Sequence, residues 1–201
     1  MKELVTAKPL KLGEHSIWPP VVLAPMAGVT NQPFRTLCRE FGPGLVYVNE
    51  MVMAAALVYK NPKTEAMIAF GPDESFRSLQ LYGSDPTIMT NAITQLGRRN
   101  AVDHIDLNFG CPAPKVTRRG GGAAVPLKKN LLREIVQAAV KTAGSFGIPV
   151  TCKFSHWTER RFVDPYSHRL NLSRCRSFGD CLACPHRTAA LRTVCTMGSD
   201  H

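Results

Sequence analysis

The chain has 201 residues, of which 44% are apolar, and a formal net charge of +10. This length supports one substantial hydrophobic core, and the composition excludes a globally disordered chain. No apolar stretch approaches the roughly 20 residues of a membrane-spanning helix, and the N-terminal residues lack a signal-peptide core, so we expect a cytoplasmic protein without membrane contact. The positive charge suits an anionic partner such as RNA, although by itself it indicates only non-specific attraction.

Between Pro19 and Phe154, short apolar runs alternate with helix-like segments. The expected strands cover residues 21–24, 45–48, 78–81, 104–108 and 150–154. The expected helices cover residues 32–41, an alanine-rich segment after Glu50, and residues 86–100 and 129–146. Strands that alternate with helices of this length indicate βαβ units and a parallel sheet.

The composition changes at Ser155. From there to His201 the chain contains no lysine but seven arginines and four cysteines, and no strand–helix alternation is visible. We predict a disordered, Arg/Cys-rich tail over residues 155–201, separate from a folded region over residues 1–154. The total of seven cysteines is odd, and without an export signal it indicates reduced thiols rather than a disulfide framework.

The turn Asn108–Pro112 (NFGCP) is the most informative short stretch of the sequence. It follows an apolar run from His104, which predicts a buried parallel strand that ends in a Gly/Pro turn. Because the loops after strand C-termini carry the chemistry in α/β barrels, Cys111 lies where a reactive group is expected. The alternative is a structural thiol, which is the common role of a buried cysteine.

Five segments resemble the tRNA-dihydrouridine synthases, and their order and approximate spacing also match. The resemblance covers residues 10–154 and is greatest for the bacterial B-type branch. Its most specific part is the NFGCP turn joined to the sequence PKVTRRGGGAA. The matching segments are Ala24–Arg35, Glu50–Met51, Leu79–Gly83, Asp106–Pro112 and Lys153–Phe154.

The resemblance implies a TIM-type (β/α)8 barrel followed by a helical domain, with FMN as cofactor, NADPH as electron donor and no metal. It implies that the intact protein is a monomer that reduces the C5–C6 double bond of particular uridines in tRNA. Asn108 would contact the flavin or the substrate, or alternatively cap the turn. The implied flavin ligands are Pro25, Met26 and Ala27 along the ring, and Gln80 and Lys153 at the polar edge, where reduced FMN gathers negative charge.

By the same resemblance, Cys111 is the general acid of the reaction. A uracil that accepts hydride at C6 needs a proton at C5, and an uncharged thiol supplies it. The basic residues Lys115, Arg118 and Arg119 are predicted to form a mobile loop beside the cysteine. They are expected to contact tRNA phosphates when the target base is flipped from its stack. The alternative for these three residues is a solvated run of charges.

The sequence departs from the family after Phe154. Five of the eight strands of a closed barrel are recognisable, the later motifs and the helical domain are missing, and Ser155 stands where the family has arginine. Codons for residues 154–157 permit a reading in which loss of one nucleotide gives Phe-Arg-Ile-Gly. Codons for residues 183–191, read in the shifted frame, permit the sequence His-Ala-Arg-Thr, which resembles the missing sixth strand of the family. We therefore expect a single-nucleotide frameshift after Phe154 and a truncated chain with feeble activity at best.

Two other functions stay open from the sequence alone. One is a different FMN-dependent barrel oxidoreductase that acts on a free pyrimidine. The other is a non-enzymatic RNA-binding fragment stabilised by zinc, because the tail contains a Cys-x-x-Cys pair and further metal-ligand types. The candidate zinc ligands are Cys175, Cys181, Cys184, His186 and Cys195.

Overall fold

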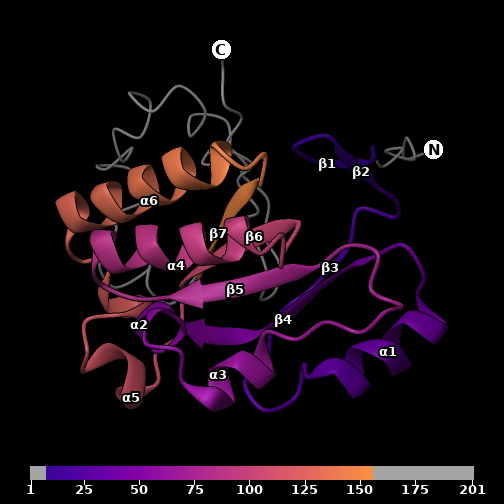
Figure 1. Cartoon of the computed structure of the whole chain (residues 1–201), viewed down its shortest axis with the longest axis horizontal. Coiled ribbons are helices and arrows are strands. Elements are labelled where there is room, and N and C mark those ends of the chain that lie inside the picture. The colour runs from indigo at the N-terminus through magenta and orange to yellow at the C-terminus, as the bar shows by residue number, and fades with distance from the viewer. Residues whose placement is uncertain (1–7, 156–201) are drawn as a thin grey trace, which may run out of the picture.

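A parallel five-stranded sheet dominates the computed structural model, which describes residues 8–155 (Figure 1). The strands lie in the order in which they occur in the chain, and every neighbouring pair is parallel. Consecutive parallel strands need crossover connections, which here are helical, as in a (β/α)8 barrel. The predicted α/β fold with five TIM-type strands is therefore confirmed. The strands are β3 (Val22–Leu23), β4 (Val46–Met53), β5 (Ser78–Tyr82), β6 (His104–Phe109) and β7 (Val150–Phe154).

Three helices begin with the same local chemistry, in which a side-chain oxygen at the N-cap accepts a backbone N–H and a proline follows within two residues. The caps are Asn31, Asn61 and Asp85, and Asp85 Oδ1 accepts from the N–H of Ile88 at 2.9 Å. The helices are α1 (Gln32–Phe41), α2 (Ala54–Val58), α3 (Pro62–Met67), α4 (Pro86–Arg98), α5 (Pro114–Thr117), the 3-10 turn η1 (Gly122–Ala124) and α6 (Lys129–Gly144).

The sheet has one apolar face and one polar face. Helices α4 and α6 lie side by side over the apolar face of β5, β6 and β7 (Figure 1). Side chains alternate between the two faces of a strand, so every second residue joins the core under these helices. The apolar set includes Leu79, Leu81, Ile105, Leu107, Val150 and Cys152. The intervening residues are polar and also buried: Ser78, Gln80, His104, Asp106, Asn108 and Thr151.

A small antiparallel hairpin precedes the parallel sheet, and the sequence did not predict it. Its strands are β1 (Leu10–Leu12) and β2 (His15–Ile17). Leu12 is fully buried and packs with Val46 and Val48 of β4. Strands of three residues are too short for a periodic pattern to show, which explains the omission.

Two other predictions about local structure were wrong. Strand β4 continues to Met53 instead of ending at residue 48, because the polar residues after Val48 remain paired with β5. The segment after Cys111 was expected to be a loop, but residues 114–117 form the short helix α5. The predicted tail over residues 155–201, its candidate zinc ligands and the proposed frameshift region lie outside the described residues, apart from Ser155.

Candidate active site

The polar residues of β5, β6 and β7 lie in register across the polar face of the sheet. Gln80 is aligned with Asp106, and Asp106 with Thr151, so these three side chains form one layer. Asn108 is aligned with Lys153 one step closer to the strand C-termini. The sequence-predicted residues on these three strands are thus brought together at one end of the sheet.

The cysteine turn fixes the orientation of two side-chain amides. Oδ1 of Asn108 accepts from the backbone N–H groups of Cys111 at 2.8 Å and Gly110 at 3.1 Å. A backbone N–H can only donate, so Nδ2 of Asn108 must point the other way, where it donates to Oε1 of Gln80 at 2.8 Å. Nε2 of Gln80 in turn donates to Oδ2 of Asp106. Asn108 therefore caps the turn, as one of its two predicted roles required.

A second series of hydrogen bonds reaches Asp106 from the opposite side. Oγ1 of Thr151 donates to Oδ1 of Asp106 at 2.6 Å. With that proton committed, Thr151 accepts from Nε2 of His104 at 3.0 Å, and Nδ1 of His104 accepts from the Ser78 hydroxyl at 2.7 Å. We call these residues the strand-end network, and their exposed fractions lie between 0% and 6%. Its members are Ser78, His104, Thr151, Asp106, Gln80 and Asn108.

Burial displaces the pKa values of two network residues in opposite directions. Burial raises the pKa of Asp106 to about 6, although hydrogen bonds from Thr151 and Gln80 and the charge of Lys153 act against the shift. Burial lowers the pKa of His104 to about 3, so its imidazole is neutral at pH 7. The network therefore contains one carboxylate that neutral groups solvate.

Cys111 is held by its backbone while its side chain stays half-buried. Its N–H donates to Asn108, and its carbonyl oxygen accepts from the N–H of Ala123 at 3.0 Å. The close approach of Gly122 permits this arrangement: its φ is +55°, and a Cβ there would lie 2.6 Å from the Cys111 oxygen. The residue that carries the thiol is thus fixed in position by both of its backbone polar atoms.

The turn after β3 carries the three predicted ring-contact residues. Pro25 is half-buried, whereas Met26 and Ala27 are exposed. The N–H of Met26 donates to Oγ1 of Thr30 at 3.0 Å, and the N–H of Gly28 donates to a carboxylate oxygen of Glu50 on β4 at 2.7 Å. The turn is therefore tied to the neighbouring strand and keeps its outer surface accessible.

A bulge in β4 brings two consecutive side chains to the polar face. The pairing of β4 with β5 shifts between Asn49 and Val52, so Glu50 and Met51 together oppose one residue of β5. Glu50 reaches the β3 turn, and Sδ of Met51 lies 3.6 Å from Nδ2 of Asn108. The bulge thus connects the β3 turn to the cysteine strand.

The three predicted basic residues, Lys115, Arg118 and Arg119, are all exposed and lie on α5 and the turn that follows it. The carbonyl oxygen of Arg119 accepts from the Ser84 hydroxyl at 3.0 Å. Burial raises the pKa of Tyr82, whose phenol is also within electrostatic reach of Arg119 and Cys111.

Sequence reasoning missed several residues of this site. Asp106, His104 and Thr151 were taken as parts of apolar strands, and Tyr82 received no role. A signal was present, because polar residues recur at every second position: 78 and 80, 104, 106 and 108, and 151 and 153. Because the same alternation occurs in three neighbouring parallel strands, it predicts that one face of the sheet is polar.

Within residues 8–155, no group of three or more His, Cys, Asp or Glu side chains is arranged to hold a metal ion. No helix in this same part of the chain is long and apolar enough to cross a membrane.

Comparison with known proteins identifies the class to which this fold and site belong. The family model "Dihydrouridine synthase (Dus)" matches residues 22–163, so the chain belongs to the dihydrouridine synthase family. A probable tRNA-dihydrouridine synthase from Mycobacterium tuberculosis is 51% identical over 151 residues, covering 72% of this chain and 39% of the relative. The tRNA-dihydrouridine synthase B of Vibrio parahaemolyticus is 36% identical over 144 residues, covering 72% of this chain and 43% of the relative. The chain thus spans about two fifths of the length of these relatives.

Proposed function

We propose that residues 1–154 form the N-terminal part of the catalytic barrel of an FMN-dependent tRNA-dihydrouridine synthase, a cytoplasmic monomer that uses NADPH to reduce the C5–C6 double bond of uridine in tRNA. The observation that carries the proposal is the strand-end network, which ends at the backbone of Cys111. Family membership gives the reaction class, and the network supplies the positioned groups that this reaction needs.

The polar groups at the strand ends fit the edge of a flavin ring. Gln80 uses one Nε2 hydrogen on Asp106 and one Oε1 lone pair on Asn108, so its amide keeps one donor and one acceptor. Lys153 is half-buried, is aligned with Asn108 on the neighbouring strand, and its charge acts on Asp106. We assign Gln80 and Lys153 to the polar edge of FMN, with Asn108 beside them. Pro25, Met26 and Ala27 would lie along the ring.

FMN, when bound, supplies hydride to C6 of the uracil. The residues of this chain must then deliver a proton to C5, and we assign that step to the Cys111 thiol. The thiol is half-buried, and its residue is anchored at both backbone polar atoms. Such anchoring holds an acid at a defined distance from a bound base, which is the main requirement for proton transfer.

The basic surface beside Cys111 favours tRNA over a free pyrimidine as substrate. Lys115, Arg118 and Arg119 are exposed, and a free base has no phosphate for them to neutralise. A base that is flipped from an RNA stack brings its flanking phosphates to the rim of the pocket. We therefore propose that these three residues contact the backbone of tRNA next to the target uridine.

A chimaera tests this function in the context of a whole barrel. Residues 22–154 of this chain replace the matching segment of the M. tuberculosis relative, and the chimaera is expressed in a strain that lacks its own dihydrouridine synthases. We expect a yellow protein that retains FMN and restores dihydrouridine in cellular tRNA, measured by mass spectrometry of nucleosides. Folded chimaera that binds no FMN would contradict the cofactor assignment. FMN-loaded chimaera that leaves tRNA unmodified would contradict the substrate assignment.

A further inference from the structure

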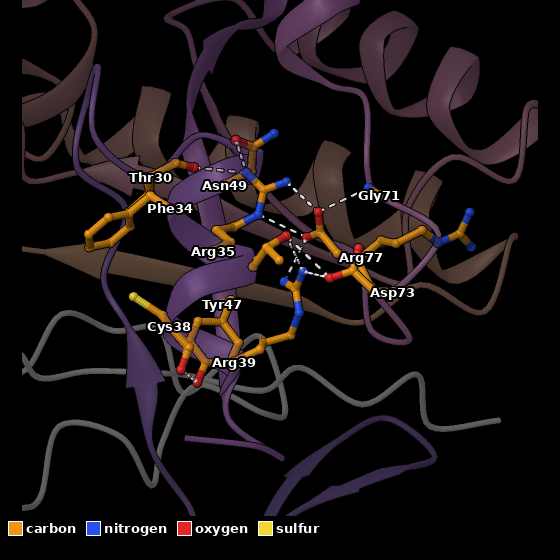
Figure 2. Close-up of polar contacts among 12 residues, drawn as sticks. Thr30, Phe34, Arg35, Cys38, Arg39, Tyr47, Asn49, Gly71, Asp73 and Arg77 are labelled. Atoms are coloured by element: carbon orange, nitrogen blue, oxygen red, sulfur yellow. Dashed lines mark hydrogen bonds and ion pairs between the residues drawn. The ribbon is translucent and has the colours of Figure 1, made fainter. Parts of the chain in front are cut away.

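Arg35 is a fully buried arginine on α1 that bonds to three other segments of the fold (Figure 2). Its Nε and Nη2 atoms donate to the two carboxylate oxygens of Glu74, each at 2.8 Å. Its Nη1 atom donates to the carbonyl oxygen of Thr30 and to Oδ1 of Asn49, again at 2.8 Å each. We call these four residues the Arg35 cluster. Four of the five N–H donors of the guanidinium are thus committed to acceptors in the cluster.

Both acceptors of Nη1 lead to the same turn after β3. Oγ1 of Thr30 accepts from the N–H of Met26 at 3.0 Å and donates to its carbonyl oxygen at 3.2 Å. Oδ1 of Asn49 also accepts from the N–H of Glu50 at 2.8 Å, and the Glu50 carboxylate accepts from the N–H of Gly28 at 2.7 Å. One guanidinium nitrogen therefore supports the turn at two separate points.

We propose that Arg35 is a positioning residue for the turn Pro25–Thr30 and thereby for the ring contacts that this turn presents. The part of the proposal that concerns the flavin rests on the proposed function, whereas the positioning of the turn does not. Arg35 lies behind the turn and is completely buried, so it acts through Thr30 and Asn49. Glu74 is the counter-ion that permits a guanidinium to occupy this place.

A purely structural ion pair would need only the Nε and Nη2 bonds to Glu74. The chain contains a matched pair of this kind, because Nε and Nη2 of Arg77 donate to both carboxylate oxygens of Asp103 at 2.9 and 2.8 Å. Its Nη1 donates to the carbonyl oxygen of Asn100, before the N-terminal ends of the strands. Arg77 thus makes the same bidentate pair with a carboxylate as Arg35 does, but it has no connection to the β3 turn.

Amide hydrogen exchange of the full 201-residue chain tests the proposal with Arg35→Lys and the matched control Arg77→Lys. A lysine keeps the positive charge but cannot reproduce the planar fork and the two further bonds. For Arg35→Lys we expect exchange at Met26, Gly28 and Thr30 to rise roughly ten- to hundredfold relative to the amides of α6, which report global opening. Arg77→Lys should leave that ratio unchanged.

An unchanged ratio in Arg35→Lys, or an equal rise in both variants, would overturn the proposal. If Arg35→Lys does not fold, the double variant Arg35→Met/Glu74→Leu removes both charges and leaves neither unpaired. It should show the same local rise at the turn, and protection equal to that of the wild type would again overturn the proposal. The readout needs no FMN, so a chimaera that fails to bind flavin would refute the proposed function and not the role of Arg35.

Discussion

The Arg35 cluster and the strand-end network are both buried and hydrogen-bonded, but they accommodate charge differently. In the cluster, the Arg35 guanidinium faces the Glu74 carboxylate at 2.8 Å, and Arg39, which also pairs with Asp73, lies 3.4 Å from the same carboxylate, so charges of opposite sign compensate one another. In the network, the Asp106 carboxylate accepts hydrogen bonds from Thr151 and Gln80, which are neutral. The first region is therefore a support in which buried opposite charges are paired. The second holds a charge that titrates near neutrality.

The difference in how the two regions accommodate charge agrees with their positions in the fold. The cluster sits behind the β3 turn and commits its donors to protein acceptors. The network runs along the polar face of the sheet, from Ser78 and His104 at the strand N-termini to Asn108 beside the cysteine turn, and Gln80 retains one donor and one acceptor within it. The comparison indicates that a buried polar group with most of its donors committed to protein acceptors serves as scaffold, whereas one that keeps both a donor and an acceptor is placed to meet a ligand.

The largest effect is expected when the charge balance of the cluster is broken. Glu74→Leu leaves the Arg35 guanidinium buried without its partner and should lower the free energy of unfolding by about 3–5 kcal/mol. The double variant Arg35→Met/Glu74→Leu should lose less, since it buries no unpaired charge. Denaturant unfolding of the 201-residue chain measures both. A double variant that is no more stable than the single one would contradict charge compensation in the cluster.

The buried charge of the strand-end network should make the free energy of unfolding depend on pH. The pKa of Asp106 is about 6 in the fold against an ordinary value of 3.8, so the folded state binds the proton more tightly. Its stabilising contribution is complete below pH 3.8 and is lost as pH rises through 6. Relative to Asp106→Asn, the wild type should therefore lose roughly 2–2.5 kcal/mol between pH 4 and pH 7, at about 1.4 kcal/mol for each pH unit by which the pKa is shifted. Unfolding free energies measured across this range test the difference.

His104→Gln serves as the control with the opposite sign. The pKa of His104 is about 3 in the fold against an ordinary value of 6.5, so its contribution is present above pH 6.5 and lost as pH falls toward 3. The wild type should thus lose stability relative to this variant on acidification. Stability curves that run parallel to the wild type for both variants would show that neither group is shifted by burial.

A smaller effect is expected at the turn that supports Cys111. In Gly122→Ala, the new Cβ would meet the Cys111 oxygen at 2.6 Å at a φ of +55°. We expect a loss of about 1–3 kcal/mol together with faster alkylation of Cys111, quantified by peptide mass spectrometry. Gly144→Ala is the matched control, because no atom lies within 4 Å of its added Cβ. Equal alkylation rates in the two variants would contradict the support we assign to Gly122.

The smallest effect is expected at a surface ion pair that belongs to neither region. Arg99 and Glu65 pair at 2.8 Å with side chains 48% and 33% exposed. Solvent screens such a pair, so Arg99→Ala should change the free energy of unfolding by less than about 1 kcal/mol. Thermal unfolding of the variant measures this. A loss comparable to that of Glu74→Leu would mean that burial is not what distinguishes the Arg35 cluster.

The parallel sheet could be predicted from the sequence because its signals are local. These signals are the apolar runs that form strands, the helical segments between them, and the Gly, Pro and capping residues that separate the two. The helix over residues 32–41 and the strand over residues 150–154 were predicted with the bounds that the structure shows. The family assignment from the NFGCP turn was likewise confirmed by the family model. The hairpin at residues 10–17 was not foreseen, because its stability comes from contacts of Leu12 with a distant strand.

The polar organisation of the site was harder to predict, since it depends on which strands are neighbours. Asn108 and Gln80 were selected individually, but their mutual hydrogen bond follows from the pairing of β5 with β6. Arg35 was noted only as part of a motif, and its partner Glu74 lies 39 residues away. No local pattern connects residues at that separation, so this support became visible only in the fold.

The most direct test of the account compares two cysteine variants of the chimaera. Cys111→Ala removes the proposed proton donor, and Cys38→Ala removes a half-buried thiol on α1 as the matched control. The measurement is the dihydrouridine content of tRNA from cells that express each variant, with bound FMN determined on the same purified proteins. We predict that Cys111→Ala retains FMN and yields little or no dihydrouridine, while Cys38→Ala matches the unsubstituted chimaera. Undiminished dihydrouridine in the Cys111→Ala strain would contradict the assignment of Cys111 as the acid.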